Sequence, residues 1–492
     1  MNTFINGIKE EMSHTFTENG AKARNTSGDY CLDFFSTAGS LRQSDESWKQ
    51  RLFLDAFQED PLSALRILFY VRDVRGGLGE RDTFRTILKK AAEKYPEHIK
   101  KNIWAIPFYG RYDDLFELIG TPCESSVWSF LKDQVKADIE DMENGRPVSL
   151  MAKWVKRGDE SSKSAHALGI MTANRLGYSV SEWKRIVAKL RKYIDVVEVK
   201  MSTKQWDKIN YSTVPSRASM IYRDAFRRHD SARYAEFLLN VESGKEKINA
   251  STLYPYDIVE KVYNNCRCSC SEDKSLQLLW DSLPDYVEGN FNALVIADTS
   301  GSMLCGNGRP FYSAISLAIY FAQRNHGEFH NYWMTFSEHP SYQKIRGNSL
   351  QEIVNNMDVS GWSMNTNLEA ALRLVLQTAV ENHVPQEDVP KSLIIISDME
   401  IDECEHSGWS FYDHMKSVYI EAGYEIPNIV FWNVNSRHDV FHADKSRRGV
   451  QLVSGQSPAT FKNLMNSIGM TPIEYMLSVI NSERYQEIQL AD

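Results

Sequence analysis

The feature that most constrains the fold is the alternation of short apolar runs with helical patterns after Leu283 and Pro284. Such alternation is typical of a mostly parallel sheet with helices on both faces. We therefore predict a doubly wound α/β domain over residues 286–492. The expected strands are Leu294–Ala297, Tyr332–Phe336, Leu393–Ser397, Ile429–Val434 and Val450–Val453. The expected helices are Tyr312–Gln323, Leu350–Asn356, Leu368–Val380, Tyr412–Ala422, Phe461–Ile468 and Pro472–Gln486.

The preceding part of the chain has helical apolar spacing from Trp48 to about Val262. Segments of ten to twenty residues are separated by Gly and Pro breakers, which predicts a solenoid (HEAT-like) or an irregular helical bundle over residues 46–285. No sequence repeat is visible, so the solenoid prediction depends only on the regular alternation of helical segments and breakers. Residues 1–45 are rich in Asn, Thr, Ser and Gly and are expected to be irregular. The predicted fold class is multidomain, α followed by α/β.

Composition excludes several classes of protein. The N-terminus lacks the apolar region of a secretory signal, and no run approaches the roughly 18 apolar residues of a membrane helix. The seven cysteines are an odd number scattered through a long chain, which does not describe a disulfide framework. We expect a soluble, cytoplasmic protein without a membrane partner. Three cysteines at alternating positions fit either a soft-metal or redox site or an incidental linker cluster: Cys266, Cys268 and Cys270.

A D-x-S-x-S segment follows the first expected strand of the α/β domain. Asp298, Ser300 and Ser302 alternate in a tight loop, with Gly301 relieving the backbone. The loop lies at the carboxyl edge of the sheet, where such folds bind ligands. One carboxylate and two hydroxyls form a hard oxygen site suited to Mg²⁺ or Mn²⁺. The alternative is a polar loop whose serines cap the next helix.

Two other loops add oxygen ligands to this edge. Thr366 precedes the helix that starts at Leu368 and offers a third hydroxyl, and Asp398 follows an apolar strand and offers a second carboxylate. This order of elements resembles the von Willebrand A domain with its metal-ion-dependent adhesion site. The resemblance implies that Asp298, Ser300, Ser302 and Thr366 coordinate the metal, and that Asp398 reaches it directly or through water.

The helical part carries a second resemblance. Residues 70–81, which read YVRDVRGGLGER, and residues 106–115, which read IPFYGRYDDL, resemble an uncharacterised family of plants, microbes and viruses. That family joins a helical region to a C-terminal von Willebrand A domain and is distantly similar to the Ro autoantigen (TROVE) family. In the Ro family, a ring of helical repeats closed by the A domain binds small non-coding RNA and single-stranded ends of defective RNA. The arginines of these motifs, next to Asp and Glu, are expected to form structural ion pairs.

The charge distribution favours a polyanionic partner for the helical part. Residues 286–492 carry a net charge of −11, whereas residues 153–233 carry +10. Basic and aromatic side chains interleaved in this way are expected for single-stranded nucleic acid, although solvated helix faces and core aromatics give the same pattern. The candidate RNA-binding residues are Lys153, Lys156, Arg157, Arg191, Lys200, Lys204, Arg217, Arg223, Arg227 and Arg228. Lys184, Arg185, Lys189 and Lys192 belong to the same basic stretch.

Enzyme motifs are missing from the sequence. Residues 76–80 lack the Lys-Ser/Thr end of a P-loop, Ser300 is not in a G-x-S-x-G elbow, and no H-E-x-x-H is present. Phosphatase-like hydrolysis at Asp298 remains an alternative. We predict a non-enzymatic RNA-binding protein of the Ro type with a divalent-metal site. The competing prediction is a metal-dependent protein-recognition module, in which a partner's carboxylate completes the metal shell and the helical part is a scaffold.

Overall fold

The computed structural model describes residues 11–267, 272–287, 292–357, 366–403 and 410–492. A helical N-terminal region precedes a C-terminal unit built on one six-stranded sheet. The helices before the sheet are α3 (Glu46–Glu59), α4 (Pro61–Arg72), α5 (Arg81–Lys94), α6 (Pro96–Lys101), α7 (Ala105–Tyr109), α8 (Glu124–Glu143), α9 (Met151–Trp154), α10 (Lys163–Leu176), α11 (Val180–Tyr193), α12 (Val197–Ser202), α13 (Ser216–His229), α14 (Ser231–Glu242), α15 (Pro255–Arg267) and α16 (Lys274–Asp281).

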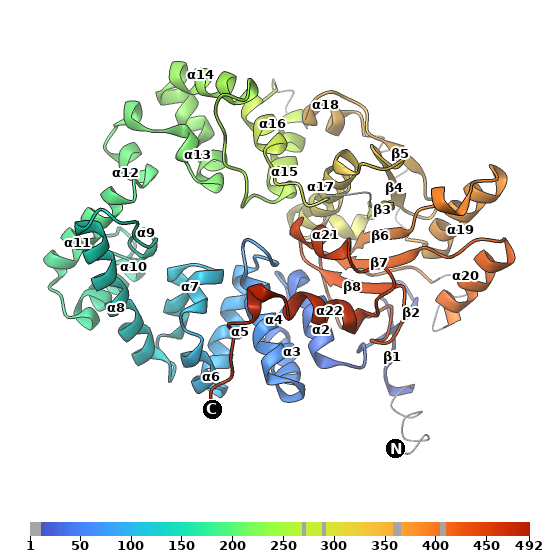
Figure 1. The fold of residues 1–492 in the computed structure, drawn as a ribbon, viewed down its shortest axis with the longest axis horizontal. Coiled ribbons are helices and arrows are strands. Elements are labelled where there is room, and N and C mark those ends of the chain that lie inside the picture. The colour runs from blue at the N-terminus through green and yellow to red at the C-terminus, as the bar shows by residue number, and fades with distance from the viewer. Residues whose placement is uncertain (1–10, 268–271, 288–291, 358–365, 404–409) are drawn as a thin grey trace.

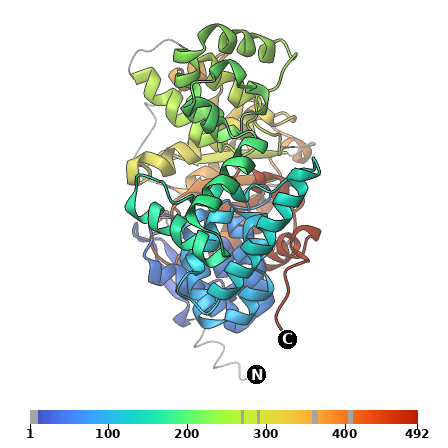
Figure 2. The ribbon, with the colours of Figure 1, turned by 90° about the vertical axis from the view of Figure 1, so that its left-hand side faces the viewer.

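These helices follow an arc that leads away from the sheet and returns to it (Figure 1). Seen from the side, the blue N-terminal helices lie at the bottom of the molecule and the green helices at its top (Figure 2). Local sequence explains their ends. Asp60 caps α4 by accepting hydrogen bonds from two backbone N–H groups, and the Ser179 and Glu182 side chains form a capping box on α11.

The N-terminal segment differs from the expectation that residues 1–45 are irregular. Strands β1 (His14–Phe16) and β2 (Lys22–Arg24) pair antiparallel, and helix α2 (Tyr30–Thr37) follows. The apolar patch of α2 is buried against other elements, so tertiary packing stabilises a helix that the polar composition around it concealed. Beyond α2, the Gly39 N–H donates to the Ser454 hydroxyl over 3.0 Å. Although it comes first in the chain, the N-terminal segment therefore packs as part of the C-terminal unit.

The sheet has the order β5-β4-β3-β6-β7-β8. All neighbouring strands are parallel except β4 and β5, which are antiparallel. The bounds are β3 (Ala293–Asp298), β4 (Tyr332–Phe336), β5 (Tyr342–Lys344), β6 (Ser392–Ser397), β7 (Asn428–Asn433) and β8 (Val450–Ser454). Five of the six were predicted to within about two residues at either end, and β5 was not.

Helices cover both faces of the sheet, with α17 and α21 on one side and α19 and α20 on the other (Figure 1). The helices of this unit are α17 (Arg309–Arg324), α18 (Leu350–Asn355), α19 (Leu368–Glu381), α20 (Ser410–Glu421), α21 (Ala459–Leu464) and α22 (Pro472–Ile480). A mostly parallel sheet covered in this way is compatible with the predicted α/β class.

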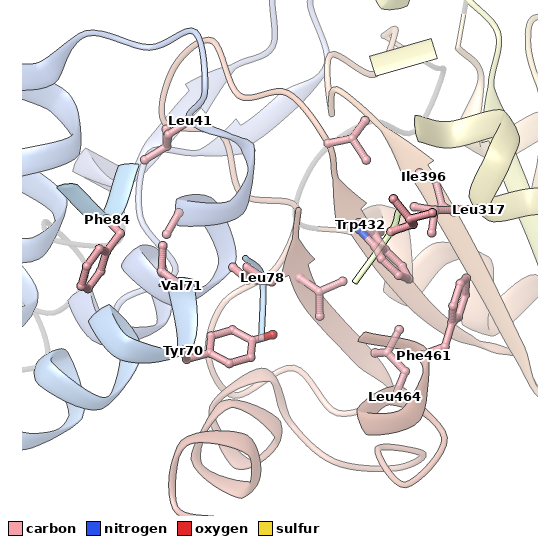
Figure 3. Packing of buried hydrophobic residues seen from close by; sticks show 14 of the residues in the cluster. Leu41, Tyr70, Val71, Leu78, Phe84, Leu317, Ile396, Trp432, Phe461 and Leu464 are labelled. Atoms are coloured by element: carbon pink, nitrogen blue, oxygen red, sulfur yellow. The ribbon is translucent and has the colours of Figure 1, made fainter. Parts of the chain in front are cut away.

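Both ends of the helical region contact the sheet unit. At the start, α2 contacts β8 and α22, and at the end, α15 contacts α17 and α18. Buried side chains of the two parts form one continuous cluster that runs from Phe84 and Tyr70 to Trp432 and Phe461 (Figure 3). The two predicted domains therefore share a hydrophobic core. Among the described residues, no helix is long and apolar enough to cross a membrane.

Candidate metal centre

The candidate centre begins where β3 ends. Every residue of this strand is buried, and its last residue, Asp298, is fully shielded from solvent. The chain then turns through Ser300, whose N–H donates to Asp298 Oδ1 over 2.8 Å. The hydroxyls of Ser300 and Ser302 lie 3.0 Å apart. The three residues of the D-x-S-x-S segment thus converge, as the sequence predicts.

The neighbouring strand β6 contributes the second part of the site. It runs parallel to β3, so the carboxyl ends of both strands reach the same edge. The Ser397 hydroxyl donates to Asp298 Oδ2 over 2.6 Å, and the next residue, Asp398, is also buried. Helix α17, which follows β3, covers one face of the sheet, and helix α19, which precedes β6, covers the other (Figure 1). The edge between the ends of β3 and β6 is therefore the topological switch point, where open α/β sheets bind ligands.

Thr366 lies at the same edge. Its hydroxyl donates to the Glu400 carbonyl over 3.2 Å, and its N–H donates to the Asp402 carboxylate. Its side chain is buried, directly before α19, which Asn367 caps. Thr366 therefore contacts the loop that contains Asp398. Residues 358–365, which precede it, lie outside the described residues.

The electrostatics of the edge favour a cation. Burial and the charge of nearby Asp398 raise the pKa of Asp298 to about 7. An additional positive charge between the two carboxylates would relieve both effects, because an opposite charge stabilises the ionised form. Arg437 already supplies part of that charge, since its Nη2 donates to Asp398 Oδ2 over 2.6 Å.

The donors present fit Mg²⁺ or Mn²⁺. Two adjacent ligands on an octahedral ion with bonds of about 2.1 Å lie about 3.0 Å apart, which matches the separation of the Ser300 and Ser302 hydroxyls. The Thr299 hydroxyl next to them is buried and has no hydrogen-bond partner among the described residues. Carboxylates and hydroxyls are hard ligands, so a soft metal is disfavoured here.

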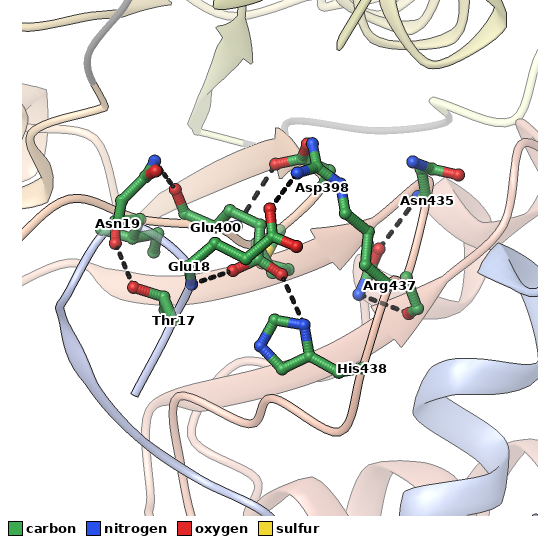
Figure 4. A network of polar contacts seen from close by, with 12 residues as sticks. Thr17, Glu18, Asn19, Asp398, Glu400, Asn435, Arg437 and His438 are labelled. Carbon is green, nitrogen blue, oxygen red and sulfur yellow. Dashed lines mark hydrogen bonds and ion pairs between the residues drawn. The ribbon is translucent and has the colours of Figure 1, made fainter. Parts of the chain in front are cut away.

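Sequence reasoning missed a polar network beside these ligands (Figure 4). Arg437 also pairs with Glu18 of the N-terminal segment, and the Glu18 N–H donates to Glu400 Oε2 over 2.7 Å. His438 Nδ1 lies 3.4 Å from Glu400 Oε1. Arg437 and His438 follow the buried strand β7, which ends at the same edge of the sheet. Their position in the sequence could therefore have predicted that they lie beside the metal ligands. Nothing in the sequence near Glu18 indicated its contact.

Six of the ten predicted RNA-binding side chains have structural partners. Arg191 donates to the carbonyls of Ala152 and Val155 over 2.8 and 2.9 Å and so fixes α11 against α9. Arg223 and Arg227 share Asp273, at 3.1 and 2.6 Å. The remaining three are Arg157 with Asp159, Lys200 with Asp195, and Arg217 with Asp257. At these six positions the cationic groups already have partners within the fold, so their presence does not by itself require a polyanion.

The other four predicted side chains differ from these. Lys204 and Arg228 are exposed, whereas Lys153 and Lys156 are half-buried. Lys153 Nζ lies 5.6 Å from the centre of the Trp154 ring. Arg111 also lies over that ring, at 4.0 Å, so one aromatic side chain of the basic stretch is already covered.

The structural ion pairs predicted for the arginine-rich motifs are confirmed at Arg72, which donates to Asp114 over 2.8 Å with both groups buried. Of the cysteine cluster, Cys268 and Cys270 lie outside the described residues, and Cys266 belongs to α15.

The comparisons with known proteins cover both parts of the chain. A family model described as Domain of unknown function (DUF7788) matches residues 292–489. The chain is similar to Uncharacterized protein L728 of Acanthamoeba polyphaga mimivirus, at 29% identity over 511 residues that cover 95% of this chain and 87% of the viral protein. A model described as Domain of unknown function (DUF2828) matches residues 17–119 and 152–295, together half of the chain. The chain therefore belongs to the DUF2828 family.

Proposed function

We propose that the protein is a non-enzymatic RNA-binding protein of the Ro (TROVE) type, in which a von Willebrand A-type domain carries a Mg²⁺ or Mn²⁺ site. The observation that carries this proposal is the closed arrangement of the chain. The helical arc contacts the sheet unit at both of its ends, as a TROVE ring closed by its A domain does (Figure 1).

The A-type assignment draws support from the sheet and its edge. The strand order, with one antiparallel edge strand, is the doubly wound order in which ligands bind between the first and fourth strands. Asp298 is the last residue of the first of these strands, β3, and Asp398 directly follows the fourth, β6. The oxygen donors at this edge suit a hard divalent ion.

Helix α11 offers the surface that best fits RNA. Trp183, Val187 and Leu190 are buried on one side of the helix. Arg185, Lys189 and Lys192 are exposed and follow the i, i+4, i+7 spacing of a single face. No ion pair involves them among the described residues. Unpaired cations aligned on a helix can neutralise successive phosphates, unlike the paired arginines of α13.

A second candidate function is metal-dependent recognition of a protein. It is favoured by Leu304, two residues after Ser302, which is apolar and yet 60% exposed. An apolar side chain beside a metal loop suits a protein interface, where a partner's carboxylate completes the metal shell.

Co-purification separates the two candidates. The full chain, prepared from cells without nuclease, is expected to carry nucleic acid that absorbs at 260 nm, is removed by ribonuclease and resists deoxyribonuclease. A preparation free of nucleic acid that also fails to bind added single-stranded RNA would contradict the RNA proposal and favour the protein partner.

A further inference from the structure

A cavity of about 350 Å³ lies at the edge of the sheet opposite the candidate metal centre. Leu294 near the start of β3 and Tyr332 at the start of β4 line it, as does Val389 just before β6. Asp298 is at the other end of β3. A ligand in this cavity would therefore not compete with the metal.

The wall of the cavity is apolar. Helix α19 contributes Val375 and Ala379, which lie on one face at i and i+4, and β5 contributes Tyr342. The Tyr342 hydroxyl lies 3.1 Å from the Thr378 hydroxyl, so this polar pair in the wall is satisfied internally. A dry cavity of about 150 Å³ is sufficient to bind benzene, and about 300 Å³ is the lower end of ligand pockets. The cavity is therefore large enough for a small organic molecule.

The charged side chains that line the cavity are both acidic. Glu328 and Asp388 line it and are exposed, whereas none of the described lining residues carries a positive charge. Lys344 lies beside this lining, with its Nζ 5.2 Å from the centre of the Tyr332 ring. Two carboxylates beside aromatic and aliphatic walls favour a ligand with an ammonium group, and aromatic faces attract the same group. Anionic amphiphiles such as fatty acids are disfavoured.

We propose that this cavity binds a small organic amine, with the apolar body of the ligand between α19 and the strands β3–β5 and its ammonium group beside Glu328 and Asp388. The site is independent of the proposed RNA and metal functions, because it shares no residue with either.

Paired probes of opposite charge test the proposal. We expect 4-phenylbutylamine to bind the full chain saturably, at least tenfold more tightly than 4-phenylbutanoate, as measured by ligand-observed NMR titration. The double variant Glu328→Gln/Asp388→Asn should reduce this preference to below threefold while leaving binding of neutral 4-phenylbutanol unchanged. Equal or tighter binding of the carboxylate would overturn the proposal.

Filling the cavity tests its location. Ala379→Met fills the cavity from its wall, and Val384→Phe fills it from its half-buried rim. Each substitution should weaken 4-phenylbutylamine binding at least tenfold. Val380→Phe is the matched control, because Val380 neighbours Ala379 but is 42% exposed and does not line the cavity. Circular dichroism checks each fold. Unchanged amine affinity in both folded filling variants, or no saturable amine binding by the native chain, would refute the site.

Discussion

Asp298 is the residue on which the metal centre depends. It is the only acid of the D-x-S-x-S segment, and its two oxygens are oriented by the Ser300 N–H and the Ser397 hydroxyl. We expect Asp298→Asn to lower Mn²⁺ affinity by about a hundredfold or more, since loss even of a supporting group costs up to about that factor. Calorimetric titration measures it, and an unchanged circular dichroism spectrum shows that the fold survives.

The control for this prediction is Glu403→Gln, which removes an exposed carboxylate from the loop after β6, the loop that also contains Asp398. Its Mn²⁺ affinity should match that of the native chain. Equal affinity of Asp298→Asn and the native chain would mean that the loop is a polar connection without a metal.

His442 makes a separate prediction about pH. It is half-buried beside β7, its Nε2 lies 3.0 Å from the Met399 carbonyl, and the partial loss of solvent around the ring lowers its pKa to about 4. In the unfolded chain, the His442 imidazole has a pKa of about 6.5. Above that pH, His442 is neutral in both states and does not lower the free energy of unfolding. As the pH falls from about 6.5 toward 4, the unfolded chain takes up the proton first, so the free energy of unfolding decreases. The loss should reach about 2 kcal/mol at pH 5.

Urea unfolding at pH 7.5 and pH 5 checks the contribution of His442. In His442→Gln, which keeps a hydrogen-bond donor but does not titrate, the difference between the two pH values should shrink by about 2 kcal/mol. An identical pH dependence in the variant and the native chain would show that other groups dominate.

Among the elements, the chain just after α2 packs closely against the turn after β8. A Cβ added at Gly39 would lie 2.6 Å from backbone atoms of Gly455, and neither backbone can move away easily. We expect Gly39→Ala to lower the free energy of unfolding by about 1–3 kcal/mol, the usual cost of overpacking. Gly327→Ala is the control, because its Cβ would meet only the Asn325 side chain at 3.5 Å. Equal stability of both variants would mean that α2 is not fixed against β8.

The elements also show what the sequence predicts and what it cannot. Strands β3 and β6 are continuous apolar runs, so their positions and the ligands after them were readable. Strand β5 has three residues and no apolar pattern, and it exists because it pairs with β4. Helix α2 was missed because its burial depends on β8, which is more than 400 residues later.

Partners of charged residues were similarly hidden. Arg223 and Arg227 look like polyanion ligands in the sequence, but Asp273, which neutralises both, lies 46 to 50 residues further on. The contact of Arg437 with Glu18 spans 419 residues. Composition gives the number of cations in a segment, whereas only the fold decides which of them remain unpaired.

At the scale of the whole molecule, a buried ion pair joins the start and the end of the helical arc. Arg42 donates to both oxygens of Glu80 at 2.6 and 2.8 Å, and to the Tyr256 hydroxyl of α15 at 3.0 Å. Glu80 is only 2% exposed. Arg42→Met should therefore cost about 3–5 kcal/mol, because it leaves a buried carboxylate uncompensated.

A double-mutant cycle isolates this contact. Arg42→Met/Glu80→Leu should recover much of the lost stability in urea unfolding, since paired apolar residues often replace a buried ion pair without loss. Additive losses in the cycle would show that the two side chains act independently and that the contact does not stabilise the closed arc.

The salt dependence of RNA binding by the full chain tests the proposed function. We expect the affinity for single-stranded RNA, measured by fluorescence anisotropy, to fall steeply from 50 to 200 mM salt as counterions are released. In Arg185→Glu/Lys189→Glu/Lys192→Glu, the logarithmic slope should be smaller by about 2, because each neutralised phosphate contributes about 0.7. The same charge change on exposed lysines of the sheet unit, Lys391→Glu/Lys416→Glu/Lys462→Glu, should leave the slope as it is. A flat salt dependence, or no RNA binding at all, would contradict the proposed function.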